Sequence, residues 1–295
     1  MQPKRPDPSG ADQGRGYVMR QVDRYRLGER EQVSDAITEE VPVAMLYNEV
    51  PFAVMMVTPL DLEDFALGFS LSEGLVAKPD DLLSMEVRPR LEGVELAMHV
   101  ASDVVGQRAG EGGERLLPGR SGCGLCGARM LEDAVRHPAP VGPGPRIETV
   151  ALERALDALQ SMQPVNSATG SVHAAAWIDV DGNIMLVRED VGRHNALDKL
   201  IGAMVKARLR SQQGFLLVTS RASYEMVTKA ASAGITVMAA ISAPTALAMH
   251  LAESTHMTLI GFARPGSYVV YTHPQRLLHA QEQRHEYRTP GGDGE

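Results

Sequence analysis

Cysteine is nearly absent from this sequence: its 295 residues include two, Cys123 and Cys126. Two cysteines separated by two residues do not make the disulfide framework that staples many secreted proteins. A structural zinc site needs four ligands, and no further cysteine is there to supply them. The scarcity of cysteine therefore argues against both of its usual structural uses.

Long apolar runs are also missing. No run reaches the roughly 18 residues that a membrane span requires, so we expect no transmembrane helix. The polar, proline-containing stretch 1–16 lacks the apolar core of a secretory signal. Together with two cysteines that are expected to stay reduced, these features predict a cytoplasmic protein.

The sequence has no surplus of basic residues. Its formal net charge is −8, which argues against general binding of nucleic acids. A local basic pocket for a phosphorylated ligand remains compatible with that charge. Hydrophobic residues make up 44% of the chain, enough for a sizeable core, and the length favours about two domains.

What the sequence does contain is a glycine-rich stretch, Ser-Gly-Cys-Gly-Leu-Cys-Gly, at 121–127. Glycine adopts tight backbone turns without strain, so this stretch is typical of an accessible loop. The alternative is a pair of buried cysteines that act as small hydrophobic residues. Glycines remove the packing surface that burial needs, so the pattern favours thiol chemistry at Cys123 and Cys126.

Four parts are predicted along the chain. They are a disordered tail over 1–25, a β-rich region over 26–145 that ends in the cysteine loop, an α/β domain over 146–275 and a mobile tail over 276–295. In the β-rich region we expect hairpins at 41–47 with 51–58 and at 85–90 with 94–100, and a helix beginning at Thr58 and Pro59. Further expected elements are a loop over 101–120, a short helix over 129–136 and a polar loop over 163–173.

The last hundred residues alternate between strand and helix patterns, which predicts a sheet with parallel strands covered by helices. A hairpin is expected at 174–180 with 184–188 because Asp-Gly-Asn lies between its two runs. The remaining expected strands are 215–219, 235–241, 258–262 and 268–272, and the expected helices are 150–162, 195–210, 223–233 and 244–254.

Polar loops follow several of these strands, where α/β sheets present their ligand sites. The loop 188–195 combines arginine, histidine and acidic residues before a helix and is suited to bind an anion. The loops 219–223 and 241–245 are weaker candidates. For all three the alternative is an ordinary capped turn. His173 precedes a strand and is either a hydrogen-bonded structural group or a ligand contact.

The stretch 262–267 ends a strand with an aromatic ring, a cation and a flexible turn, a combination that suits a nucleobase or a pterin with phosphate. Because side chains alternate along an extended backbone, we expect Phe262 and Arg264 to face the same side. The alternative is a plain hairpin with Phe262 in the core.

Three motifs together resemble the FdhD family of sulfurtransferase accessory proteins that formate dehydrogenase requires. They are Cys-Gly-Leu-Cys-Gly at 123–127, Arg-Glu-Asp-Val-Gly-Arg-His-Asn-Ala-Leu-Asp-Lys at 188–199 and Ser-Arg-Ala-Ser-Tyr-Glu-Met-Val at 220–227. The resemblance covers residues 39–273, most of the chain.

The resemblance implies an α/β (α+β) fold with a cytidine-deaminase-like three-layer C-terminal domain and a smaller β-rich N-terminal domain, usually in a homodimer. It implies a persulfide on Cys123, made with sulfur from a cysteine desulfurase, and Cys126 as a helper. The acceptor is the molybdenum cofactor in its bis-molybdopterin guanine dinucleotide form, bound as a substrate and mimicked by GDP. The family's cofactor-binding segment matches Phe262, Ala263, Arg264, Pro265, Gly266 and Ser267.

Nucleotide arms of this cofactor are then expected on Arg188, Asp190, Arg193, His194, Ser220 and Arg221, with arginines on phosphates and with Asp190 or Glu189 on the guanine base. No permanently bound cofactor or metal is expected. The expected partners are a cysteine desulfurase and the catalytic subunit of formate dehydrogenase, with neither nucleic acid nor membrane.

Two other functions stay open on the residues alone. A thioredoxin-like dithiol oxidoreductase fits the spacing of the cysteines, and a non-catalytic chaperone fits a cofactor-binding protein that moves no sulfur. A zinc deaminase does not fit, because the H-x-E and P-C-x-x-C signatures are both missing.

Overall fold

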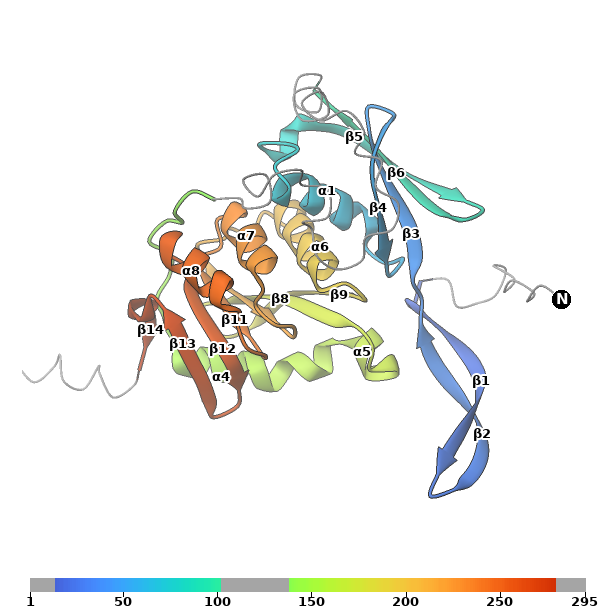
Figure 1. Ribbon diagram of the computed structural model, residues 1–295. Helices are drawn as coiled ribbons and strands as arrows, with labels where there is room; N and C mark the ends of the chain where they lie inside the picture. The colour runs from blue at the N-terminus through green and yellow to red at the C-terminus, as the bar shows by residue number, and fades with distance from the viewer. Residues whose placement is uncertain (1–13, 102–137, 280–295) are drawn as a thin grey trace, which may run out of the picture.

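The computed structural model describes residues 14–101 and 138–279. Cys123 and Cys126 lie outside the described residues, as do the helix expected over 129–136 and nearly all of the loop expected over 101–120. In the described part of the chain, no helix is long and apolar enough to cross a membrane. A small β-rich unit and a larger unit with three layers lie against each other (Figure 1).

A two-stranded ribbon precedes the first unit. Strands β1 (Tyr17–Arg26) and β2 (Glu29–Thr38) pair antiparallel and extend away from the body of the molecule (Figure 1). The expected disordered tail over 1–25 is therefore wrong for residues 17–25. Most side chains of both strands are exposed to solvent, so no apolar alternation in the sequence marks them.

The β-rich unit is a four-stranded sheet in the order β4-β3-β6-β5. Its two expected hairpins are confirmed as β3 (Val41–Tyr47) with β4 (Val50–Val57), and β5 (Leu82–Arg90) with β6 (Gly93–Val100). The core of this unit lies between the sheet and helix α1, where buried side chains include Tyr47, Phe65 and Met98.

Helix α1 (Leu62–Ser72) begins later than Thr58 and Pro59 suggest. Thr58 caps nothing in this helix; its hydroxyl accepts a hydrogen bond from the backbone N–H of Val191, in the other unit. The residue before the helix, Asp61, has a left-handed backbone and makes no capping bond with its side chain. A contact with a distant part of the chain has replaced the local cap that the sequence predicts.

The larger unit is built on a six-stranded sheet in the order β13-β12-β11-β10-β8-β9. Its strands are β8 (His173–Asp179), β9 (Ile184–Asp190), β10 (Gly214–Val218), β11 (Val237–Ala240), β12 (Thr258–Arg264) and β13 (Ser267–Thr272). Strands β10, β11 and β12 run parallel, as the alternating pattern predicts, and the other pairs are antiparallel.

Helices cover both faces of this sheet (Figure 1). Helices α6 (Arg193–Lys206), α7 (Tyr224–Ser232) and α8 (Ala246–Ser254) pack on one face around side chains such as Trp177. Helix α4 (Thr149–Leu159) packs on the other face around side chains such as Phe215. The expected three layers and the smaller β-rich N-terminal unit are confirmed.

Two further expectations about local structure are wrong. The expected loop over 163–173 contains helix α5 (Pro164–Thr169), after the short 3₁₀ helix η2 (Gln160–Met162). The expected mobile tail from residue 276 starts with ordered structure, because β14 (Leu277–Leu278) pairs with β7 (Ile147–Glu148). Buried Arg276 holds this end by donating hydrogen bonds to the carbonyls of Gly142 and His256. Two more 3₁₀ helices are η1 (Pro79–Asp81) and η3 (Pro274–Arg276).

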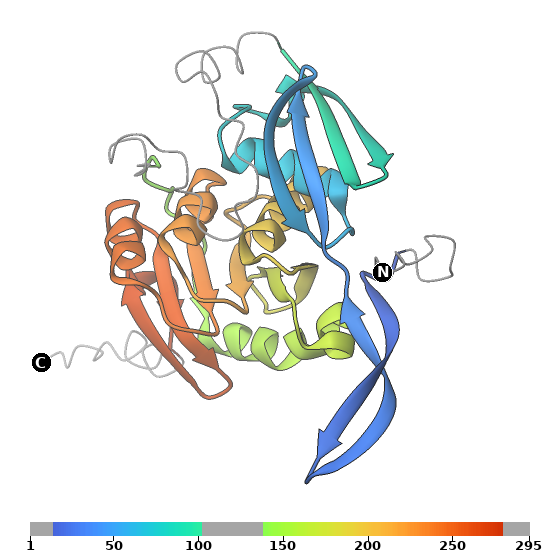
Figure 2. The ribbon, with the colours of Figure 1, turned by 45° about the vertical axis from the view of Figure 1, so that its right-hand side comes forward.

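The two units meet where α1 lies against α6 (Figure 2). Two glycines allow this contact: a Cβ on Gly68 would overlap the backbone oxygen of Asp198, and one on Gly202 would overlap the backbone oxygen of Asp64. The backbones of the two helices therefore approach more closely than larger side chains permit. This contact fixes the β-rich unit against the middle of α6.

Candidate functional site

One edge of the six-stranded sheet gathers loops that are far apart in the sequence. The parallel strands β10 and β11 end there, followed by the loops 219–223 and 241–245. Strand β8 is antiparallel to β10, so its first residue, His173, lies at the same edge, opposite Asp190 at the end of β9. The backbone N–H of Phe262 donates to the carbonyl of Ser242 and brings β12 to this edge as well. We refer to this set of loops as the sheet edge.

Three helices begin at the sheet edge. Helices α6, α7 and α8 start at Arg193, Tyr224 and Ala246, directly after the loops that follow β9, β10 and β11. The Thr245 hydroxyl caps α8, whereas the residues before α6 and α7, Gly192 and Ser223, provide no side-chain cap. The uncapped N–H groups and the positive ends of the helix dipoles favour an anion at this edge.

Basic side chains reinforce this preference. His173 lies close enough to Arg193 and His194 for their charges to affect its titration. Burial is the main cause that lowers the pKa of His173, and the positive charges of Arg193 and His194 lower it further. His173 is therefore neutral at neutral pH and can accept or donate one hydrogen bond through each ring nitrogen.

His194 also pairs with a residue of another helix. Its Nε2 atom lies 2.6 Å from Oε2 of Glu225, in the first turn of α7, and both side chains are largely withdrawn from solvent. This pair ties the beginnings of α6 and α7 together. The sequence motif at 220–227 contains Glu225, but an acidic residue in a first turn is usually explained by the helix dipole. The sequence therefore gives no reason to single out Glu225. Its role in joining α7 to α6 becomes visible only in the ion pair with His194.

The loop 219–223 contributes one exposed and one buried residue. Ser220 is buried and donates its hydroxyl hydrogen to the backbone oxygen of Arg221. The Arg221 residue itself is exposed beside the start of α7. Arg221 is therefore free to reach a bound anion, whereas Ser220 stabilises the turn that presents it.

The segment 262–267 forms the end of β12, a turn and the start of β13. Phe262 and Arg264 are exposed, and Ala263 between them is 1% exposed. Pro265, Gly266 and Ser267 are exposed as well.

The alternative expectation, a plain hairpin with the Phe262 side chain buried in the core, is wrong. Its ring is 44% exposed, and its backbone has a φ of 51°, which is uncommon for a bulky residue. A register irregularity between β12 and β13 at this point provides the local bend. An exposed aromatic ring in a bent segment is available to stack on a flat ligand.

Arg188 does not lie free at the sheet edge. Its Nε and Nη2 atoms donate to Oδ2 of Asp64 at 2.9 and 2.7 Å, and its Nη1 donates to the carbonyl of Val187. Arg188 therefore joins β9 to α1 and holds the two units together. The expected phosphate contact of Arg188 is not compatible with this arrangement.

Asp190 is wholly buried and its carboxylate is fully used within the protein. Oδ2 accepts from the backbone N–H of Thr58 and lies 2.7 Å from Nζ of Lys199. Oδ1 accepts from the N–H of Gly192 and from Nδ2 of Asn195. The expected pairing of Asp190 with a guanine base is therefore wrong, because no lone pair direction remains for a ligand.

Glu189 is committed as well. Its two oxygens accept from the backbone N–H groups of Val165 and Asn166, in the first turn of α5. Burial raises the pKa of Glu189 and these two hydrogen bonds oppose that rise. Glu189 therefore acts as a cap for a short helix with both of its oxygens, so its expected base contact is wrong too.

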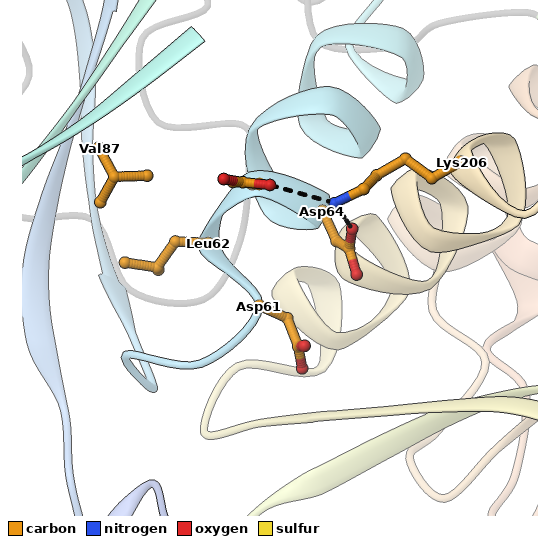
Figure 3. A pocket seen from close by; sticks show the side chains of 6 residues that line it. Asp61, Leu62, Asp64, Val87 and Lys206 are labelled. Atoms are coloured by element: carbon orange, nitrogen blue, oxygen red, sulfur yellow. Dashed lines mark hydrogen bonds and ion pairs between the residues drawn. The ribbon is translucent and has the colours of Figure 1, made fainter. Parts of the chain in front are cut away.

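A separate pocket of about 360 Å³ lies between α1, β5 and α6 (Figure 3). Its charged side chains satisfy one another, since Nζ of Lys206 lies 3.3 Å from Glu63 and 2.8 Å from Asp64. Asp61 lies 3.5 Å from Arg188 at the same place. This pocket is part of the contact between the units, and its three acidic side chains against one lysine make it unsuited to an anion.

Metal coordination by the described residues has no support, because no group of three or more histidine, cysteine or carboxylate side chains there is arranged to hold a metal ion. The sheet edge thus offers cations, helix N-termini and an aromatic ring. The expected site residues that lie at the sheet edge are Arg193, His194, Arg221, Phe262 and the segment 263–267. The other expected site residues, Arg188, Asp190 and Ser220, form hydrogen bonds within the protein and support its own structure.

Comparisons with known proteins agree with this architecture. A sulfur carrier protein FdhD from Xanthomonas euvesicatoria pv. vesicatoria is 55% identical over 273 residues, covering 92% of this chain and 95% of that protein. One from Cupriavidus necator is 51% identical over 258 residues, covering 88% and 89%.

A solved structure shows the same fold. The crystal structure of a Desulfotalea psychrophila protein described as a formate dehydrogenase accessory protein matches with a TM-score of 0.68 and 22% identity, covering 89% of this chain and 99% of that one. The model of the FdhD/NarQ family matches residues 38–278, which include both units and the sheet edge. The resemblance seen in the sequence motifs is thereby confirmed, and the chain belongs to the FdhD/NarQ family.

Proposed function

We propose that this protein is a cytoplasmic sulfur carrier that serves formate dehydrogenase. Cys123 takes sulfur from a cysteine desulfurase as a persulfide and passes it to the molybdenum cofactor in its bis-molybdopterin guanine dinucleotide form. The names of the relatives support the sulfur carrier role, and the identity of about one residue in two supports its transfer to this chain. A homodimer and the catalytic subunit of formate dehydrogenase complete the proposed assembly.

The observation that carries the acceptor side of this proposal is the convergence of three helix N-termini at the sheet edge. Arg193, His194 and Arg221 lie at or beside the first turns of α6 and α7. Backbone N–H groups at helix N-termini and arginine side chains are the groups that bind phosphates in proteins. A diphosphate of the dinucleotide fits this environment, with Phe262 positioned to stack on a ring.

The chemistry of the carrier follows from thiol exchange. The Cys123 thiolate attacks the outer sulfur of the desulfurase persulfide, the S–S bond breaks, and the desulfurase thiolate leaves with the electron pair. No net oxidation accompanies this step, because one persulfide replaces another. In the release step the Cys126 thiolate attacks the inner sulfur of the Cys123 persulfide, which forms a disulfide and expels hydrosulfide towards the acceptor. A cellular dithiol then reduces the disulfide.

Intact-mass spectrometry after incubation with a desulfurase and cysteine tests the carrier function. Persulfidation adds one sulfur atom, about 32 Da, to one thiol. We expect this adduct on the wild-type protein and on Cys126→Ala, and its absence from Cys123→Ala. An adduct that forms only through Cys126 would reverse the assignment of the two cysteines.

The two alternative functions give different results in the same set of variants. A chaperone that moves no sulfur should still activate formate dehydrogenase when Cys123 is replaced by alanine. A dithiol oxidoreductase should cycle between dithiol and disulfide and acquire no sulfur adduct from the desulfurase. Loss of activation by Cys123→Ala together with loss of the adduct is the result that supports the sulfur carrier.

A further inference from the structure

The ribbon of β1 and β2 extends away from both units and has little core of its own (Figure 2). Its strands pair over their whole length, from Tyr17 with Thr38 at the base to Arg26 with Glu29 at the tip. It precedes residue 38, where the match to the FdhD/NarQ family begins. A two-stranded ribbon by itself is only marginally stable in water, and its outer edges offer unpaired backbone groups. A long projecting ribbon therefore suggests a surface for a partner.

The pairing register gives the ribbon two different faces. Side chains alternate along each strand, and residues directly opposite each other lie on the same face. On one face, which we call the ribbon face, the opposed pairs from base to tip are Val18 with Ile37, Arg20 with Asp35, Val22 with Val33, Arg24 with Glu31, and Arg26 with Glu29. The ribbon face thus alternates apolar and charged rows, with its arginines on β1 and its acidic residues on β2.

The opposite face is occupied by contacts within the chain. Its two charged residues, Asp23 and Arg30, form an ion pair at 2.8 Å. At the base, the hydroxyl of Thr38 lies 2.9 Å from that of Thr169, at the end of α5, and 2.5 Å from that of Ser171. The opposite face is therefore turned towards the body of the molecule at the base, and the ribbon face is turned away from it.

The charges of the ribbon face have no ionic partner among the residues that the structure describes. Arg20 donates to the carbonyl of Met19, and Asp35 accepts from the backbone N–H of Ala36, but none of the three opposed pairs closes into an ion pair. All of these charged residues except Asp35 are exposed, and so is Ile37, at 42%. The ribbon face therefore carries apolar rows and balanced charges that are available to another molecule.

The order of the rows makes the ribbon face complementary to itself. A two-fold axis that runs along the ribbon, between two ribbons stacked face to face, places β1 of one copy over β2 of the other at the same height. Each arginine then faces an acidic residue, and each apolar row faces an apolar row. A two-fold axis across the ribbon would instead stack β1 on β1 and bring like charges together. A symmetric contact requires such self-complementarity, and the charge pattern selects the first arrangement.

The tip of the ribbon carries an apolar residue that the turn does not require. Leu27 and Gly28 form the turn with φ values of 52° and 89°. Turns with two positive φ angles favour asparagine, aspartate and glycine, because a larger side chain is strained there. Leu27 is nevertheless 100% exposed. The axis along the ribbon brings the two tips to the same end of the contact, where the two Leu27 side chains can cover each other.

We propose that the ribbon face is the contact between two copies of this chain, with β1 of each copy stacked on β2 of the other. This inference rests on the proposed function only for the existence of the homodimer and supplies the surface that forms it. It does not depend on the transfer of sulfur.

Sedimentation equilibrium of the full-length protein tests this contact through charge reversal. Arg24→Glu and Glu31→Arg each bring like charges together twice in the dimer, so each should weaken self-association about ten-fold or more. In a mixed dimer of the two variants every reversed charge meets an opposite one. An equimolar mixture should therefore associate as the wild type does. Single variants that dimerise normally, or a mixture that stays as weak as its components, would overturn the proposal.

Arg30→Glu is the matched control, because it makes the same change of charge on the opposite face of the same ribbon. It should dimerise as the wild type does, and a loss of the dimer equal to that of Arg24→Glu contradicts the assignment of the face. Thermal unfolding confirms that each variant is folded. If a single variant does not fold, the double variant Arg24→Glu with Glu31→Arg keeps the test, since it restores every opposed pair and should dimerise.

Salt and a second partner separate the remaining outcomes. Self-association of the wild type should weaken when the salt concentration rises from about 0.1 M to about 1 M, because the screening length falls from about 10 Å to about 3 Å. A wild type that is monomeric throughout overturns the proposal, and weaker binding of the ribbon variants to the catalytic subunit of formate dehydrogenase would then identify that protein as the partner. Persulfide loading of Cys123 is measured on the same variants and should not change, so a failure of the sulfur carrier function remains distinguishable from a failure of the dimer contact.

Discussion

Nζ of Lys199 lies 2.7 Å from Oδ2 of Asp190, and neither side chain is exposed to solvent. Lys199 also donates to the carbonyl of Thr58, so the pair joins α6, the end of β9 and the β-rich unit. Burial lowers the pKa of Lys199, and the charge of Asp190 opposes that change. The loop before α6 therefore takes its shape from a buried ion pair and is fixed before any ligand binds.

Replacement of Asp190 by asparagine should destabilise the protein by about 3–5 kcal/mol, the cost of leaving a buried charge without its partner. Lys199→Met should be destabilising as well, and the double variant should lose less than the sum of the two, since the orphaned charge is then removed. Unfolding in urea measures all three. Strict additivity of the two single losses would show that the pair is not coupled.

Replacement of Gly68 by alanine should destabilise the contact between the two units. The new Cβ would overlap the backbone oxygen of Asp198, so α1 and α6 must move apart, at a cost of about 1–3 kcal/mol for overpacking. Gly142→Ala is the control, because nothing lies within 4 Å of a Cβ at that position. A urea midpoint that is equal in the two variants contradicts the close approach of the helices.

His173 should make the stability of the protein depend on pH. Its pKa is lowered in the folded state, mainly by burial and then by Arg193 and His194, so below its ordinary pKa near 6.5 the unfolded chain takes up a proton that the folded protein resists. This contribution to stability is present above pH 6.5 and is lost as the pH falls through the lowered pKa. The free energy of unfolding of the wild type should therefore fall more steeply from pH 7.5 to pH 5.5 than that of His173→Gln. Parallel curves for the two proteins would contradict this prediction.

Phe262→Ala should weaken binding of GDP by about ten-fold, which corresponds to about 1.4 kcal/mol. The ring is 44% exposed, so its removal opens no large cavity and the melting temperature should stay close to that of the wild type. Titration with GDP and thermal unfolding, on the same samples, separate the two effects. If Phe262→Ala unfolds at a much lower temperature than the wild type but binds GDP with the same affinity, the GDP site does not include Phe262.

Local sequence patterns determined most of the secondary structure of this protein. The hairpins, the helices of the α/β unit and the order of its strands follow from side-chain periodicity, which depends on neighbours within a few residues. Side-chain periodicity failed to predict an element that packs against no hydrophobic core. Strand β1 (Tyr17–Arg26) is exposed on both faces, so its sequence resembles that of a tail.

The motifs also determined the family and the region of the candidate site. The loops 188–195 and 219–223 and the segment 262–267 all contribute to the sheet edge, because the carboxyl ends of parallel strands meet at one edge of a sheet. This much follows from topology, and topology follows from the alternation of strands and helices along the chain.

Only the tertiary structure decided which polar side chains the protein uses for its own hydrogen bonds. Asp190 and Glu225 are both acidic residues of motif-bearing segments, and the sequence favours Asp190. In the folded chain Asp190 is enclosed by Lys199 and backbone N–H groups, whereas Glu225 keeps one oxygen without a partner among the described residues. The physical reason is that hydrogen-bond partners come from segments more than a hundred residues away, such as Thr58 for Asp190, and short-range patterns contain no information about them.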